Sequence, residues 1–322
     1  MQIGFKLFAE ANSPSELVRQ AVRAEEAGFD FLEISDHFHP WLPEHGHAPA
    51  AWSVLPAIAM RTERIRLGTG VTCPFIRYHP AIIAQAAATT ACLAPGRVFV
   101  GLGTGENLNE HIVGQGWPAI DVRREMLDES IEIIRRLWQG GYRTWRGQHL
   151  RIESAQVFDI PDPLPELIVA AGGPKAARLA AERGDGLFAV AADRVLTDTY
   201  ARFGGTGPKY VEVPLAWAPD EDTAARSAHR LFRFGDGGWP VTVELPNPYN
   251  FDAATRQVTV DSMREGFACG PDAAKHLAKV QEFVDAGFDH LALINAGPDI
   301  DGFFDFYARE LAGPIREITG PA

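Results

Sequence analysis

Residues 31–41 read Phe-Leu-Glu-Ile-Ser-Asp-His-Phe-His-Pro-Trp, and this stretch says more about the fold than any other part of the chain. Its apolar start predicts a buried parallel strand, and Asp36, His37, His39 and Trp41 follow that strand directly. In a parallel α/β sheet, ligands bind and chemistry occurs at the carboxyl ends of the strands. A carboxylate, two imidazoles and an indole at that edge therefore indicate an active site rather than a helix cap and a packed indole.

Strands and helices alternate along the rest of the chain. Ser13-Pro14-Ser15-Glu16 is a capping box that opens a helix ending at Gly28. The expected strands are residues 2–7, 30–35, 65–70, 97–102, 165–171, 186–191, 210–216 and 289–295. The expected helices are 17–27, 52–61, 80–92, 126–138, 175–183 and one from about 303. Eight strands alternating with helices favour an α/β protein with a closed (β/α)8 TIM barrel, in one domain over 1–322, rather than an open doubly wound sheet.

Two connections, 104–121 and 233–258, are longer than a barrel needs. Unstructured connections of this length are typical of lids and binding loops. We therefore expect both to be insertions over the C-terminal face of the barrel.

The composition excludes several classes of function. The chain has 322 residues and a formal net charge of −12, which argues against binding a nucleic-acid backbone. Its three cysteines form no CxxC motif and indicate neither a disulfide framework nor a thiolate zinc site. No apolar run suggests a secretory signal or a membrane span. These features predict a cytoplasmic protein that acts on a small molecule, with no nucleic-acid or membrane partner.

Glycines surround an acidic residue at the end of the fourth expected strand. Gly101-Leu-Gly-Thr-Gly-Glu106 lacks the spacing of a dinucleotide fingerprint, and no helix follows at once. Glycine allows the backbone to approach a flat ligand closely. Glu106 could cap a helix in a turn, but its position beside the His37 strand predicts an acid/base pair.

The fifth expected strand ends in Gly172-Gly-Pro-Lys175. Its glycines precede a helix whose free amide groups would suit an anion, although glycine pairs also occur in ordinary tight turns. The His37-Phe-His39 pair also fits a metal site. The later strand ends provide no further ligands, and so we expect no metal.

These segments together resemble the luciferase-like (β/α)8 superfamily, and within it most resemble the coenzyme F420-dependent glucose-6-phosphate dehydrogenase family. The residues that carry the resemblance run from the first strand to the last helix and are dense at strand ends. They are Glu10, Ser35–Trp41, His47–Pro49, Leu67–Val71, Arg77–Ala86, Gly103–Glu110 and Ala170–Pro174.

The resemblance implies that F420 lies across the barrel mouth as cofactor. The implied contacts to its ring and ribityl chain are Asp36, Gly70, Val71, Cys73, Thr104, Gly105 and Asn109, and those to its phosphate are Gly172, Gly173, Lys175 and Ala176. The implied catalytic set is His37 as the acid/base on the substrate hydroxyl, Glu106 beside the ring, and Trp41 and Glu10 on the substrate side.

The chain departs from the family at the sugar-phosphate site. Asp193 and Ala253 stand where two lysines are expected, and Arg264 matches an arginine on the substrate. An aspartate would repel a phosphate, which favours a neutral alcohol, a ketone or an uncharged sugar over glucose 6-phosphate. Near the ring, Cys73 replaces the usual threonine and His39 a common glutamine.

Two other functions remain open at this point. The first is an FMN-dependent luciferase-like monooxygenase or reductase, and the second is a cofactor-binding protein without turnover. An intact set of Asp36, His37 and Glu106 argues against the second. We also expect a homodimer, because this superfamily pairs through early helices and the face formed by Ala81, Ala84, Ala87 and Ala88 would allow close contact. The same alanines could instead pack on the barrel.

Overall fold

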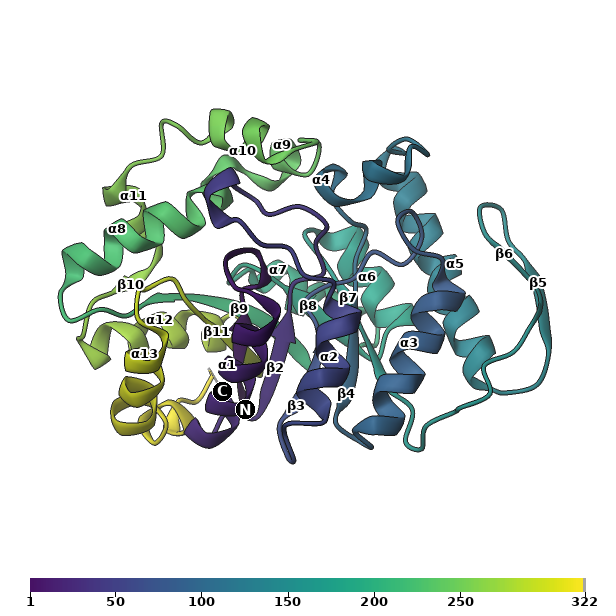
Figure 1. Cartoon of the computed structure of the whole chain (residues 1–322), viewed down its shortest axis with the longest axis horizontal. Helices are drawn as coiled ribbons and strands as arrows, with labels where there is room; N and C mark the ends of the chain where they lie inside the picture. The colour runs from purple at the N-terminus through teal and green to yellow at the C-terminus, as the bar shows by residue number, and fades with distance from the viewer. Residues whose placement is uncertain (321–322) are drawn as a thin grey trace.

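Eight parallel strands close into a barrel in the computed structural model, which describes residues 1–320 (Figure 1). Around the ring they are β1 (Gln2–Leu7), β2 (Phe31–Ile34), β3 (Arg66–Thr69), β4 (Val98–Leu102), β7 (Glu166–Ala170), β8 (Gly186–Ala189), β9 (Lys209–Ala216) and β11 (His290–Asn295). Because β11 pairs with both β9 and β1, the ring has no free edge. The predicted (β/α)8 barrel is confirmed, and every strand bound lies within two residues of the expected one.

Large rings fill the inside of the barrel because glycines on neighbouring strands make room for them. A Cβ on Gly4 of β1 would lie 2.3 Å from the ring of Phe31, and one on Gly68 of β3 would lie 2.4 Å from the Phe99 carbonyl oxygen. The interior cluster consists of Phe31, Phe99, Ile168, Phe188, Tyr210 and Ala292. This packed layer closes the barrel below the mouth, so that a ligand can enter only at its end.

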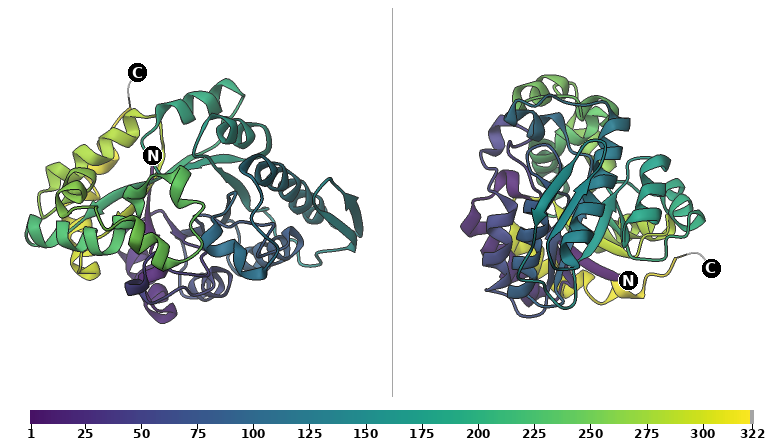
Figure 2. Two further views of the ribbon diagram at one scale, coloured as in Figure 1. Left: turned by 90° about the horizontal axis from the view of Figure 1, so that it is seen from above. Right: turned by 90° about the vertical axis from the view of Figure 1, so that its right-hand side faces the viewer.

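Helices surround the strands (Figure 2). They are α1 (Pro14–Ala27), α2 (Ala51–Ala59), α3 (Pro80–Leu93), α5 (Ile120–Trp138), α6 (Pro174–Arg183), α7 (Arg194–Arg202), α8 (Glu221–Phe232), α12 (Ala273–Asp285) and α13 (Ile300–Phe306). The Ser13 hydroxyl accepts the Glu16 N–H at the start of α1, as the capping box predicts. The α5 helix begins at Ile120 rather than at 126, because its first turn is mostly exposed and the apolar period begins only at Leu127.

The expectation of unstructured insertions is wrong. Residues 104–121 contain α4 (Asn107–Glu110) and a 3₁₀ turn (His111–Val113). The second insertion contains a 3₁₀ turn (Arg233–Gly237), α9 (Trp239–Thr242) and α10 (Pro248–Ala254), and is followed by α11 (Val260–Gly266) and β10 (Ala268–Cys269). Local capping explains two of these short helices: Asn247 accepts two N–H groups at the start of α10, and Thr259 caps α11.

The two insertions are joined to each other at one end of the barrel, where Figure 1 shows α4, α9 and α10. The Asn107 N–H donates to the Val243 carbonyl over 2.9 Å, and its side-chain amide donates to the Glu244 carbonyl over 2.9 Å. A hairpin that the sequence did not predict, β5 (Arg143–Arg146) with β6 (Arg151–Ala155), projects from the body in Figures 1 and 2.

The alanine face of α3 lies inside the chain. Ala84, Ala87 and Ala88 are fully buried, and the Trp138 indole N–H donates to the Ala84 carbonyl over 2.9 Å. The interpretation in which these alanines pack on the chain's own barrel is therefore correct. These three alanines provide no surface for a second subunit, whereas Ala81 is half-buried.

Candidate active site

Three of the predicted catalytic side chains meet at the carboxyl ends of the strands. Glu10 follows β1, His37 follows β2 and Glu106 follows β4. The Nδ1 atom of His37 lies 2.7 Å from Glu10 Oε1, and its Nε2 atom lies 3.7 Å from Glu106 Oε2. The imidazole therefore stands between two carboxylates, with Nδ1 held by Glu10 and Nε2 left as the nitrogen that can meet a substrate.

The pair of His37 and Glu10 is buried and mutually stabilised. Burial lowers the pKa of His37, but Glu10 and then Glu106 outweigh it, so that the pKa lies above its ordinary value of 6.5. Burial raises the pKa of Glu10, but His37 and Lys6 outweigh it and the pKa lies below its usual value. Glu10 therefore stays ionised and stabilises positive charge on the imidazole.

Trp41 forms one wall beside His37. Its ring lies edge-on to the imidazole at 4.6 Å between centroids. Phe234 stacks on the indole at 4.6 Å, and Phe251 contacts it edge-on at 5.2 Å. Both phenylalanines come from the second insertion, and neither was predicted from the sequence as a site residue. The feature of the sequence that could have indicated them is the presence of aromatic residues inside a glycine- and proline-rich insertion.

Asp36 is committed to contacts within the protein. Thr72 donates its hydroxyl to Oδ2 over 2.7 Å, and Tyr78 donates to Oδ1 over 3.2 Å. The Arg77 guanidinium lies 3.2 Å from Oδ1 and also donates to the Asp36 carbonyl. The Asp36 carboxylate thus fixes the segment after β3 against the segment after β2.

Asn109 orients the residues around it. Its Oδ1 accepts the N–H groups of Phe38 and His39, and its Nδ2 donates to Glu106 Oε2 over 3.0 Å. The His39 ring is held by the Leu108 carbonyl at 2.8 Å. Within residues 1–320 no group of three or more potential ligands could hold a metal ion.

Bare backbone lies beside this cluster, at the ends of β3 and β4. Gly105 has a φ of 73°, and a Cβ there would lie 2.8 Å from the Cys73 sulfur. A Cβ on Gly103 would lie 2.6 Å from Val71 Cγ2. The peptide bond between Gly70 and Val71 is cis. Thr104, Gly105, Gly70 and Val71 are partly exposed, and so this strip of backbone could contact the face of a flat ligand.

The start of α6 is suited to an anion. Its N-cap is Gly173, and no side chain caps the helix there, whereas Ser13, Asp220 and Asp272 cap α1, α8 and α12. No atom lies within 4 Å of where a Cβ on Gly173 would be, and the Trp239 indole is 3.7 Å from where a Cβ on Gly172 would lie. Lys175 is mostly exposed, with its ammonium 3.2 Å from Asp121, and Ala176 is partly buried. Free helix amides and a nearby lysine are a suitable site for a phosphate.

The residues expected around a substrate phosphate have other partners. The Arg264 guanidinium contacts three carboxylates, those of Glu221, Asp222 and Asp261, at 2.9–3.5 Å. Asp193 caps α7 by accepting the Val195 N–H, and Ala253 is exposed on α10. The sequence prediction that Arg264 contacts substrate therefore finds no support in its contacts.

Arg77 and Glu110, which belong to the family pattern, also contact each other in this region. The Arg77 N–H donates to Glu110 Oε2 over 2.9 Å, and Glu110 is almost fully buried. Burial, partly offset by Arg77, raises the pKa of Glu110 to about 7. The pair links the β3 end to α4, directly beneath Gly105.

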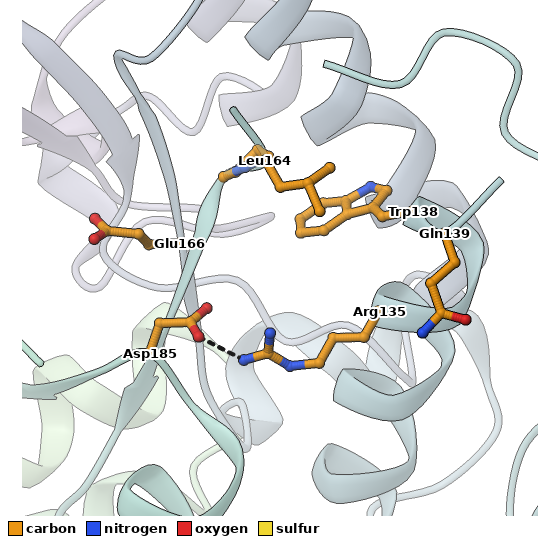
Figure 3. Close-up of a pocket in the computed structure, with 7 residues that line it drawn as sticks. Arg135, Trp138, Gln139, Leu164, Glu166 and Asp185 are labelled. Atoms are coloured by element: carbon orange, nitrogen blue, oxygen red, sulfur yellow. Dashed lines mark hydrogen bonds and ion pairs between the residues drawn. The ribbon is translucent and has the colours of Figure 1, made fainter. Parts of the chain in front are cut away.

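A cavity of about 420 Å³ lies at the opposite end of the barrel, before β7 (Figure 3). Its lining consists of Arg135, Trp138, Gln139, Leu164, Pro165, Glu166 and Asp185. Arg135 and Asp185 pair across it at 2.8 Å, as the dashed line in Figure 3 marks. Residues at this amino-terminal face of a barrel contribute to stability rather than to catalysis.

Comparison with known proteins agrees with this architecture. The family profile described as luciferase-like monooxygenase matches residues 1–290. The chain belongs to this family. The resemblance inferred from the strand ends is thereby confirmed at the level of the superfamily.

Relatives with assigned functions match over the full length. The F420-dependent glucose-6-phosphate dehydrogenase of Mycobacterium avium (strain 104) is 34% identical over 340 aligned positions, covering 99% of both chains. The enzyme of the same name from Nocardia farcinica (strain IFM 10152) is 35% identical, again with 99% of both chains covered. The narrower resemblance, to the F420-dependent glucose-6-phosphate dehydrogenase family, is thereby confirmed as well.

Solved structures of other proteins share the fold. An F420-dependent secondary alcohol dehydrogenase in complex with an F420-acetone adduct superposes with a TM-score of 0.90 at 30% identity, covering 97% of this chain and 98% of that one. The coenzyme F420-dependent tetrahydromethanopterin reductase from Methanopyrus kandleri has a TM-score of 0.79 at 20% identity, covering 98% and 99%. The second likeness shows the fold alone.

Proposed function

We propose that the protein is an F420-dependent oxidoreductase that interconverts an uncharged secondary alcohol and its ketone. The observation that carries the proposal is the His37 imidazole held between Glu10 and Glu106 at the mouth of the barrel. Both full-length relatives described above and the 30%-identical structure are named for F420-dependent dehydrogenases.

The residues at the mouth fit a deazaflavin with a phosphate-bearing tail. The strip of backbone from Gly70 to Val71 and from Thr104 to Gly105 could lie against the ring, with Cys73 behind it. The uncapped start of α6 at Gly173, with Lys175, could hold the phosphate. When bound, F420 would accept or return the hydride, and the protein would supply binding and orientation.

The chain's own residues supply the proton chemistry. Neutral His37 can take the hydroxyl proton of an alcohol at Nε2, while ionised Glu10 stabilises the positive charge that forms at the ring. Protonated His37 can return that proton when a ketone is reduced. Glu106 is held in place by Asn109, and Trp41 limits how the substrate can approach the imidazole.

An uncharged substrate is favoured because the nearby cations already have partners. Arg264 contacts three carboxylates, and the Arg233 guanidinium contacts Glu44 and Asp252. A phosphate dianion that leaves water without paired donors costs several kcal/mol. The stacked rings of Trp41 and Phe234 offer an apolar surface instead.

A substrate panel with oxidised and reduced F420 tests the proposal. It compares secondary alcohols, ketones, free sugars and glucose 6-phosphate by kcat/KM, following the F420 absorbance. We expect secondary alcohols or ketones to be the best substrates. A highest kcat/KM with glucose 6-phosphate would contradict the uncharged substrate, and turnover only with FMN would replace the F420 assignment.

We also propose that the protein is a cytoplasmic homodimer. None of the helices in residues 1–320 has the length and apolar character that crossing a membrane requires. Ile82 and Leu93 on α3 are large apolar side chains that remain exposed and could contact a second subunit. Sedimentation at micromolar concentration should give about twice the 35.2 kDa of one chain. A 35.2 kDa particle would contradict the dimer.

A further inference from the structure

One buried lysine lies below both halves of the candidate site. Lys6 is on β1 and is almost fully buried. Its ammonium donates to the Gly70 carbonyl over 2.9 Å, at the end of β3 where the cofactor strip begins. The same ammonium lies 2.5 Å from Glu212 Oε1 on β9 and 3.5 Å from Glu33 Oε1 on β2. It thus connects three other strands of the barrel.

The same cation also influences the acid/base pair. The carboxylates within ion-pair distance of the Lys6 ammonium are Glu212 and Glu33, and those beside the His37 ring are Glu10 and Glu106. The charge of Lys6 acts on Glu10 and His37 at longer range. Lys6 lowers the pKa of Glu10. It also lowers the pKa of His37, because its positive charge disfavours a second positive charge on the imidazole. Burial raises the pKa of Glu33 well above its usual value; Lys6 opposes this rise, and Glu212 adds to it.

The carboxyl of Glu33 packs tightly below the cofactor strip. A Cβ on Gly70 would lie 3.0 Å from Glu33 Cδ, so that the cluster is in contact with the backbone above it. An unpaired charge at this depth would lose more free energy by desolvation than it gains from its contacts. The charges of this cluster therefore have to compensate one another. Removing its one cation would change both the backbone above it and the charge beside Glu10.

We propose that Lys6 is a positioning residue that fixes the Gly70 backbone against the cofactor and sets the charge balance of the Glu10–His37 pair. The inference goes beyond the proposed function in naming the residue that couples the cofactor strip to the proton-transferring pair. It rests on the proposed function only in taking Glu10 and His37 as the pair that transfers the proton. It therefore needs a test that works without turnover.

The test is an NMR titration of the His37 imidazole in the full-length protein without cofactor, labelled at its ten histidines. The His37 signal is assigned by its loss in His37→Gln. In Lys6→Met the cation that opposes protonation is gone, and the pKa of His37 should move upward by about half a unit or more. In the same variant, F420 affinity measured by quenching of Trp fluorescence should fall several-fold, because the Gly70 carbonyl has lost its donor.

A control variant separates this role from a general effect of mutation. Lys209→Met removes a lysine paired with Asp289 at 2.6 Å, at the amino-terminal start of β9, and should leave the His37 titration unchanged. If Lys6→Met does not fold, the double variant Glu33→Gln/Glu212→Gln leaves the cation unbalanced and should move the pKa of His37 downward.

An unchanged His37 titration in Lys6→Met or, if that variant does not fold, in the double variant would overturn the proposal. An equal shift in Lys209→Met would do the same, because the effect would then not belong to Lys6. Loss of F420 turnover with every substrate would count against the proposed function alone, since the NMR measurement needs neither cofactor nor substrate.

Discussion

Replacing Glu10 by glutamine should lower the pKa of His37 by roughly one unit. Glutamine keeps an oxygen that can accept the Nδ1–H across the 2.7 Å contact but carries no charge. A hydrogen bond to a charged group is worth about 1.5–3 kcal/mol and a neutral one about 0.5–1.5 kcal/mol. The difference, about 1–1.5 kcal/mol, corresponds to roughly one pKa unit.

The kcat/KM for alcohol oxidation and that for ketone reduction depend on pH with opposite sign, although both profiles should shift to lower pH in the variant. Alcohol oxidation needs neutral His37, and so its kcat/KM rises as pH increases through the pKa of this residue. In Glu10→Gln that rising limb should move to lower pH, with a lower plateau because the imidazole is a weaker base. Ketone reduction needs protonated His37, and its falling limb should move in the same direction.

The free energy of unfolding should also depend on pH through the raised pKa of His37. The folded-state pKa of His37 is raised, so that its contribution to the free energy of unfolding is fully present below the unfolded value of 6.5 and is lost as pH rises through the folded value. The stability of the wild type relative to Glu10→Gln should therefore increase as pH falls from about 9 to about 6 in urea unfolding.

A matched variant and a clear contrary result complete this test. Glu106→Gln should shift the His37 titration less, because that carboxylate lies 3.7 Å from the ring rather than 2.7 Å. Identical pH profiles and identical NMR titrations in wild type and Glu10→Gln would refute the reasoning, since they would mean that Glu10 does not stabilise the charged imidazole.

Three further predictions concern the same site. His37→Ala should lose about 10²–10⁴-fold in turnover but retain F420 affinity, and equal loss of affinity would indicate a structural histidine instead. F420 should quench the intrinsic Trp fluorescence at lower concentration than FMN; the reverse order would favour a flavin enzyme. Gly105→Ala should weaken F420 binding and lower stability by about 1–3 kcal/mol, because the residue has a φ of 73° and faces Cys73. Unchanged affinity and unfolding midpoint would show that this turn can relax.

The sequence predicted the barrel and the position of its site from local patterns. Apolar runs of four to eight residues, separated by helical periods, predicted all eight strands, and strand ends carry the polar residues that chemistry needs. His37 and Glu106 could be chosen from the sequence because parallel strands place their carboxyl ends at one face, whereas Glu10 came from the family resemblance. Caps such as Ser13 are equally local, and they too were predicted.

Only the tertiary structure decided how these side chains are held. Asp36 and Asn109 are predicted to contact the cofactor, and hydrogen bonds within the protein orient both of them. Arg264 looked like a substrate contact, but neighbouring carboxylates surround it. These hydrogen bonds and ion pairs are made with residues distant in the sequence, and no local sequence pattern predicts them.

Closure of the barrel also determined the electrostatics. Lys6 reads as an ordinary polar residue in the first strand, and only the ring of strands brings Glu33, Glu212 and the Gly70 carbonyl around its ammonium. Phe234 came onto Trp41 in the same way, through packing of the second insertion. The sequence by itself thus determined the strands and the chemistry at their ends, whereas burial and long-range contact, which exist only once the ring has closed, decided the charge state and orientation of each group.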